Sequence, residues 1–122
     1  MAWRWILALL ISLAALPRAG QAHAIIVDSS PGVNATVAGP DLDITLRFNS
    51  RIDRARSSMS LTPPDLKSGD KPALLPLDPV DAPDLLKAHA ANLKAGAYSL
   101  RWQVLSVDGH ITRGDIPFKV GR

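Results

Sequence analysis

The chain has 122 residues, which is enough for one domain and little more, and it contains no cysteine. Without cysteine, the domain cannot rely on disulfides and offers no thiolate to a soft metal ion. Of the 14 basic residues, Arg4 and Arg18 lie within residues 1–22, so 12 basic residues face 11 acidic ones in the remainder. Residues 23–122 are therefore nearly neutral and contain no cluster of Lys and Arg, which gives no support for nucleic acid as a partner.

Residues 1–22 have the three-part pattern of a secretory signal peptide. Arg4 supplies the charged start, Ile6–Leu16 is an apolar run interrupted only by a serine, and small residues lead to Ala22. The run is shorter than the roughly 20 residues that cross a bilayer, which argues against a permanent membrane anchor. We therefore predict an exported protein in which residues 1–22 are removed and residues 23–122 form one domain.

Two cleavage positions fit the local sequence. Cleavage after Ala22 makes His23 the new N-terminus, whereas cleavage after Ala24 discards this histidine. The second position has small residues at both Ala22 and Ala24 and fits the A-x-A rule slightly better. The local sequence leaves this choice open.

Apolar residues alternate with polar ones along much of the remaining chain, which is typical of half-buried strands. Three sets of apolar residues each share one face: Ile44, Leu46 and Phe48; Tyr98, Leu100, Trp102 and Val104; and Ile116, Phe118 and Val120. Shorter strands are predicted within residues 24–28, 58–61 and 73–77. Residues 78–93 are ambiguous, and their apolar residues permit a helical turn: Leu85, Leu86, Ala88 and Ala91.

The predicted fold is all-β, a two-sheet sandwich or small barrel. About seven short strands, separated by Gly-, Pro- and Asp-rich turns, fill the roughly 100 residues of the mature chain. We expect the large residues Phe48, Trp102 and Phe118 to lie in its core.

Two of the three histidines are candidate metal ligands. If His23 becomes the N-terminal residue, its amine and ring Nδ1 can chelate one ion, and such a nitrogen pair suits Cu(II). Asp108 and His110 are two residues apart, so on an extended backbone they project to the same side, where the Asp can bind the metal or orient the His. The alternative for this pair is a D-G turn at Gly109 followed by a solvated histidine. We interpret His89 as a surface or structural residue, because it has no partner at a convincing ligand spacing.

Other chemistry lacks a recognisable motif. The sequence contains no Gly-rich phosphate loop, nucleophile elbow or HExxH. Met59 is the one methionine in residues 23–122, so a Met-rich Cu(I) site is not expected. The chain is therefore not predicted to be an enzyme.

Taken together, these residues resemble the CopC-type family of periplasmic copper-binding proteins over essentially the whole mature chain. The similarity is strongest from Gly96 to His110, where the sequence follows the pattern G-x-Y-x-x-x-W-x-x-x-S-x-D-G-H. Further matching positions are His23-Ala24, Ser30-Pro31-Gly32, the segment Ile44–Phe48, Gly114 and Phe118.

The resemblance implies a Greek-key β-sandwich or barrel, Ig-like or cupredoxin-like, that binds one Cu(II) ion near one end. His23 would bind through its amine and ring and His110 through its ring, while Asp108 would lie at or beside the metal. The resemblance also favours cleavage before His23. It implies a periplasmic role in copper homeostasis or resistance, with an inner-membrane copper transport protein as a partner.

One departure from the family pattern concerns Ser50. Some members have a glutamate near the Cu(II) ion shortly after the Phe of the second strand, and here Ser50 stands at that place. Because a neutral hydroxyl cannot replace a charged ligand, we expect the site to be weaker or differently completed.

Two other functions compete with this interpretation. A copper-dependent monooxygenase also uses an N-terminal His chelate and a second His, but the short chain and Asp108 beside the metal argue against it. A purely structural Ig-like module, in which the histidines are incidental, predicts no stoichiometric copper binding.

Overall fold

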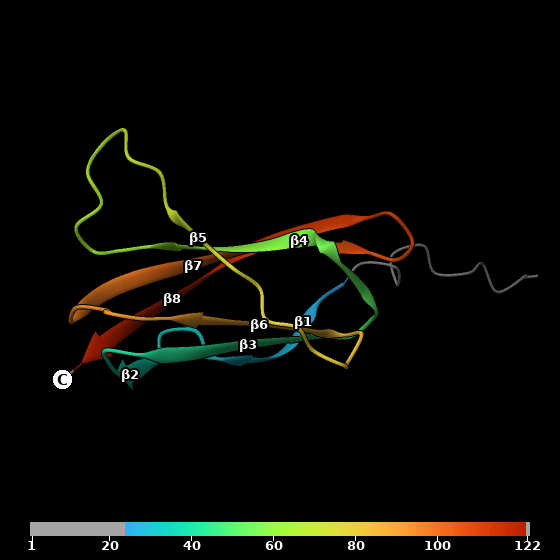
Figure 1. The fold of residues 1–122 in the computed structure, drawn as a ribbon, viewed down its shortest axis with the longest axis horizontal. Coiled ribbons are helices and arrows are strands. Elements are labelled where there is room, and N and C mark those ends of the chain that lie inside the picture. Colours follow the sequence, from blue (N-terminus) through green and yellow to red (C-terminus); the bar gives the residue numbers. More distant parts are fainter. Residues whose placement is uncertain (1–23, 122) are drawn as a thin grey trace, which may run out of the picture.

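The computed structural model describes residues 24–121, and this part of the chain contains strands and turns but no helix. Eight strands follow one another along the chain (Figure 1): β1 Ile26–Ser30, β2 Thr36–Ala38, β3 Leu42–Phe48, β4 Ile52–Thr62, β5 Ala73–Leu75, β6 Leu85–Ala90, β7 Gly96–Ser106 and β8 Ile111–Gly121. The described residues therefore contain no helix that is long and apolar enough to cross a membrane.

The strands form two sheets that face each other as a sandwich (Figure 1). One sheet has the order β1-β3-β6, and the other has the order β2-β8-β7-β4-β5. All pairings are antiparallel except that of β2 with β8, which is parallel. The predicted two-sheet all-β fold is confirmed, with eight strands where about seven were expected.

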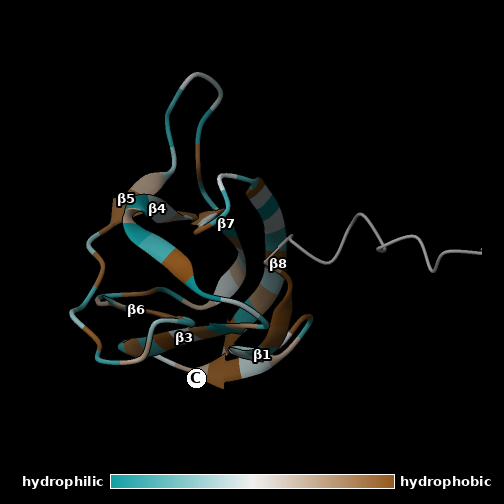
Figure 2. Ribbon diagram, turned by 90° about the vertical axis from the view of Figure 1, so that its right-hand side faces the viewer, coloured by the Kyte–Doolittle hydropathy of each residue, from teal (hydrophilic) through white to brown (hydrophobic). Residues whose placement is uncertain are grey.

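The core lies between the sheets and is built from the alternating residues that the sequence indicated. The three predicted faces are all buried, and bands of apolar and polar residues alternate along β8 (Figure 2). Phe48 meets Trp102 edge-to-face with ring centroids 5.4 Å apart, and Tyr98 stacks on Phe118 at 5.5 Å. These contacts confirm the expected core positions of Phe48, Trp102 and Phe118.

The ambiguous segment 78–93 contains a strand, so the alternative of a helical turn is wrong. β6 pairs along its length with β3, and the side chains of Leu86, Ala88 and Ala90 are buried. Lys87 and His89 occupy the alternate positions of β6. The period-two pattern was present but short, and the prolines before it concealed it.

β4 carries an irregularity that divides its pairing with β7 into two parts. Ile52 and Asp53 pair with the end of β7, and regular pairing resumes only at Ser58. The buried Ser57 connects the two strands across this gap: its hydroxyl donates to the carbonyl of Asp53 at 2.6 Å and accepts from the backbone N–H of Leu105 at 3.2 Å. The N-terminal end of β4 therefore stays attached to β7 near the β7–β8 turn.

We predict that Gly114→Ala destabilises the protein by about 1–3 kcal/mol, the usual cost of overpacking a core. A Cβ atom at this position would lie 2.8 Å from Cζ2 of Trp102, whose ring is held by Phe48. Urea denaturation followed by Trp fluorescence measures the change. Gly32→Ala is the control, because a Cβ atom there meets nothing within 4 Å. Equal stabilities of the two variants would contradict the prediction.

Candidate metal centre

The candidate site is built on the turn between β7 and β8, residues 107–110. The backbone N–H of Gly109 donates to the carbonyl of Ser106 at 2.9 Å, and the N–H of Ser106 donates to the carbonyl of His110 at 2.9 Å. Gly109 has φ +93°, a conformation that residues with a Cβ rarely adopt. The D-G turn that the sequence indicated is therefore present.

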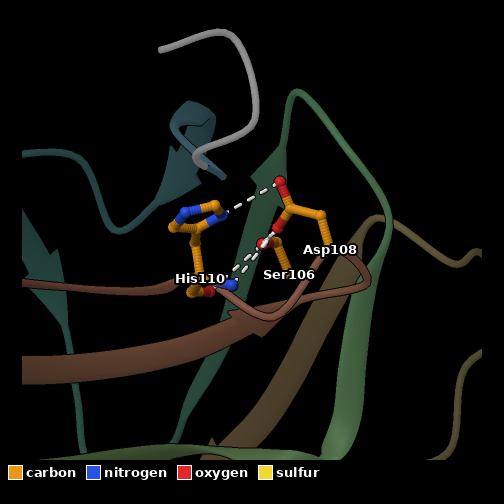
Figure 3. Close-up of polar contacts among 3 residues, drawn as sticks. All are labelled: Ser106, Asp108 and His110. Atoms are coloured by element: carbon orange, nitrogen blue, oxygen red, sulfur yellow. Dashed lines mark hydrogen bonds and ion pairs between the residues drawn. The ribbon is translucent and has the colours of Figure 1, made fainter. Parts of the chain in front are cut away.

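This turn brings the carboxylate of Asp108 against the ring of His110 (Figure 3). Nδ1 of His110 lies 3.1 Å from Oδ2 of Asp108, and the backbone N–H of His110 donates to Oδ1 at 3.2 Å. The hydroxyl of Ser106 donates to the same Oδ1 and lies 3.1 Å from the carbonyl of His110. The two predicted residues do meet, but through a turn rather than through the alternation of an extended strand.

Hydrogen bonds favour the charged form of the Asp108 carboxylate. The hydrogen bond from the Ser106 hydroxyl, which is the largest influence, lowers the pKa of Asp108 below its ordinary value of 3.8. Burial opposes this effect, and the backbone and ring of His110 lower the pKa further. The Asp108 and His110 side chains remain 35% and 54% exposed. The pair is therefore fixed in position and still open to an ion from solvent.

The contact between Nδ1 and the carboxylate also determines which nitrogen can bind a metal. When a neutral imidazole donates its Nδ1 proton to a carboxylate, the lone pair is on Nε2. A carboxylate in this position orients the ring, as is usual for histidines that bind metals. Of the two roles predicted for Asp108, this geometry favours the orienting role.

Two other segments reach this end of the sandwich. The N–H of Ile25 donates to Oδ1 of Asn49 at 2.8 Å, and the N–H of Asn49 donates to the carbonyl of Ile25 at 2.9 Å. The N–H of Val107 donates to the carbonyl of Arg51 at 3.3 Å. The β3–β4 corner, residues 49–51, is thus bonded both to the chain entering β1 and to the β7–β8 turn.

The remaining predicted residues differ in their outcomes. His23 lies outside the described residues, so its role stays a prediction. Within residues 24–121, no three His, Asp, Glu or Cys side chains are grouped so that they could hold a metal ion.

His89 lies on the exposed side of β6, where its Nδ1 is 2.9 Å from Oδ1 of Asp43; this hydrogen bond raises the pKa of His89. Its interpretation as a surface histidine is confirmed.

Sequence reasoning overlooked the role of Ser106. This residue continues the buried face of Tyr98, Leu100, Trp102 and Val104, and it is only 2% exposed. A hydroxyl at a core-facing position needs hydrogen-bond partners, and Asp108 two residues later is the nearest polar side chain in the sequence. A polar residue at the end of an otherwise apolar strand face is therefore the sequence signal that could have predicted this hydrogen bond.

We predict that Ser106→Ala raises the pKa of Asp108 toward its ordinary value, because it removes the strongest donor to the carboxylate. A carboxyl group with a lowered folded pKa contributes stability above its unfolded pKa and loses it as the pH falls through the folded pKa. Ser106→Ala should therefore flatten the acid side of the stability profile. NMR titration of the Asp carboxyl carbons in metal-free protein measures the pKa, with Ser58→Ala as a control. An unchanged Asp108 pKa would refute the prediction.

Comparison with known proteins identifies the family. The sequence model of the CopC domain family matches residues 26–121 of this chain. CutJ of Bacillus subtilis (strain 168), a copper transport protein, is 31% identical over an alignment of 127 positions, which covers 98% of this chain but only 22% of CutJ. Copper resistance protein C of Xanthomonas campestris pv. juglandis is 33% identical over 103 residues, with 81% of this chain and 80% of that protein covered.

Solved structures show the same fold. The crystal structure of CopC from Methylosinus trichosporium OB3b has a TM-score of 0.66 at 34% identity, covering 80% of this chain and 93% of that one. PcoC, a methionine-rich copper resistance protein from Escherichia coli, has a TM-score of 0.65 at 28% identity, covering 82% and 100%. The chain therefore belongs to the CopC family of copper-resistance proteins, which are non-enzymatic, bind copper and are typically periplasmic.

Proposed function

We propose that this protein binds one Cu(II) ion in the periplasm, after removal of residues 1–22, and that it buffers copper or delivers it to an inner-membrane copper transport protein. The amine and ring of His23 and the ring of His110 would be the ligands. Asp108 would lie beside the metal and orient His110. No Met-rich Cu(I) site is included, because the one methionine of residues 24–121, Met59, is buried in the core.

The contact between Asp108 and His110 is the observation that carries this proposal. It presents an imidazole in a defined orientation at an exposed turn, and imidazole nitrogen is a preferred ligand of Cu(II). Copper stands at the top of the affinity order for divalent metals, so a nitrogen-rich site already prefers it to zinc. The chemistry of these residues therefore fits a Cu(II) ion.

The hydrogen bonds of Ile25 support the part of the proposal that concerns His23. Ala24 is fully buried, and Ile25 is bonded in both directions to Asn49. In the sequence, His23 directly precedes this anchored part of the chain. The same corner is bonded to Val107 in the β7–β8 turn, as a site shared between these two segments requires.

The relatives support a role in copper handling. One relative is named copper resistance protein C, and CutJ is named a copper transport protein. The region of CutJ that matches this chain is only 22% of CutJ, so the name supports a role in copper handling and not a transport activity of this chain.

We predict that the exported protein binds one equivalent of Cu(II) with an axial, nitrogen-rich EPR signal. His23→Ala and His110→Ala should lose stoichiometric binding. Asp108→Asn should bind about 10–100-fold more weakly, because it removes a partner that orients a ligand. Affinity should fall as the pH is lowered, since protons compete for the nitrogen ligands.

His89→Ala is the matched control, because it removes a histidine paired with Asp43 on another face and should leave binding unchanged. Sequencing of the N-terminus establishes whether His23 is the first residue of the protein under test. Full affinity in His110→Ala would contradict the ligand assignment. Absence of stoichiometric binding in the unaltered protein would favour the purely structural module.

A further inference from the structure

The outer edge of β8 has a stretch that no other described strand covers. β8 pairs with β7 from Ile111 to Val120, whereas β2 pairs only with residues 119–121. The segment before β2 extends this cover as far as Pro117, whose carbonyl accepts from the backbone N–H of Asn34 at 2.6 Å. The edge of residues 111–115 therefore has no partner strand in the described part of the chain.

The unpaired backbone groups on this edge belong to alternate residues of β8. The carbonyl of Pro117 and the N–H of Lys119 point away from β7, because both bond to the segment of residues 34–35. The register of β7 with β8 continues without a shift along the whole pair. Since an antiparallel strand directs the groups of alternate residues to opposite edges, Arg113 and Asp115 direct their N–H and C=O groups to the free edge.

The other outer edges of the two sheets are protected. β2 and β5 have three residues each, and β1 carries a register shift between Ile26 and Asp28. The outer edges of β6 and of the start of β4 are both bonded to the segment of residues 78–83. Short length, irregularity and cover by another segment are the usual ways in which proteins keep a strand edge from pairing with a second chain. The stretch of residues 111–115 has no such cover.

The side chains on this edge are complementary in charge to a second copy of themselves. Arg113 is exposed, and Asp115 is half-exposed with its Oδ2 3.4 Å from Nη1 of Arg101. Two copies that join these edges about a two-fold axis form an antiparallel strand pair in which both contribute the same residues. An axis at Arg113 or at Asp115 places like charges opposite each other, which destabilises a strand pair. An axis at Gly114 instead places Arg113 of each copy opposite Asp115 of the other.

We propose that the exported protein forms a weak dimer in which β8 of each copy pairs with β8 of the other, antiparallel and centred on Gly114. Arg113 and Asp115 of one copy exchange backbone hydrogen bonds with Asp115 and Arg113 of the second copy, and their side chains form opposite-charge pairs. The five-stranded sheet of each copy then continues into that of the other. β2 and Pro117, which has no N–H, limit the strand pair to a few residues, so the buried area is below about 1,200 Å², as in transient complexes.

The dimer leaves the candidate metal centre of each copy accessible. His110 directly precedes β8, so antiparallel pairing places the two β7–β8 turns at opposite ends of the paired strands. The contacts that form the dimer involve neither Asp108 nor His110. Association is therefore independent of copper and goes beyond the proposed function.

Sedimentation equilibrium of the copper-free exported protein, up to millimolar concentration, measures the association. The unaltered protein should dimerise, and its dissociation constant should rise with salt, because salt screens exposed ion pairs. Arg113→Asp and Asp115→Arg should each weaken self-association about tenfold or more, since each places like charges opposite each other. An equimolar mixture of these two variants should regain the unaltered association, because opposite charges then meet at both positions.

The register can be tested by disulfide formation, because the chain has no cysteine of its own. Residues that exchange hydrogen bonds across an antiparallel pair have Cα atoms about 5.5 Å apart, within the range that a disulfide bridges. A mixture of Arg113→Cys and Asp115→Cys should therefore form disulfide-linked dimers faster than either variant alone. Faster linkage of Arg113→Cys to itself would contradict a dimer centred on Gly114.

Lys119→Asp is the matched control, because it makes the same change of charge on the same face of β8 where β2 covers the edge, and it should leave association unchanged. Urea denaturation of dilute protein separates a folding defect from lost association, and all three charge variants should keep the unaltered midpoint, since these side chains are exposed. The proposal fails if the unaltered protein stays monomeric, if the mixture associates no better than its components, or if Lys119→Asp weakens association as much as Arg113→Asp. Each of these outcomes leaves the proposed function untouched, because no copper is present.

Discussion

The pairing of β7 with β8 holds both the core and the candidate metal centre in place. The ladder runs from Gly96 opposite Val120 to Leu105 opposite Ile111, and its inner face carries the core residues Tyr98, Trp102 and Phe118. β4 pairs with the other side of β7, and β2 pairs with the end of β8. The turn that closes this hairpin is therefore attached to the most extensively paired part of the sheet, as a site of defined geometry needs.

The contacts at that turn matter for geometry more than for stability. An ion pair between two partly exposed side chains contributes little to the free energy of folding, because solvent screens it. The donors from Ser106 and from the backbone of His110 nevertheless restrict Asp108 to one position, and Asp108 in turn orients the imidazole. A ligand held in this way loses less conformational entropy when it binds an ion.

A comparison of the two His–Asp contacts shows why only one is a candidate site. His89 and Asp43 lie as close together as His110 and Asp108 do, but they are cross-strand neighbours on the outside of the β3–β6 pair. The pair at the β7–β8 turn lies where the chain entering β1 and the β3–β4 corner also arrive. The meeting of separate segments, rather than the residue types, distinguishes a place where several ligands can converge on one ion.

Local sequence patterns predicted the strands with long alternating faces, the aromatic core and the turn at Gly109, because burial of one face and a positive φ both leave such patterns. The sequence also singled out Asp108 and His110 and carried the family pattern. β6 was missed because its alternation is short. The hydrogen-bonding role of Ser106 and the attachment of Asn49 to Ile25 and of Arg51 to Val107 were decided only by the tertiary structure. These contacts join segments that are far apart in the chain or depend on the exact turn, and local patterns do not encode which distant segments pair.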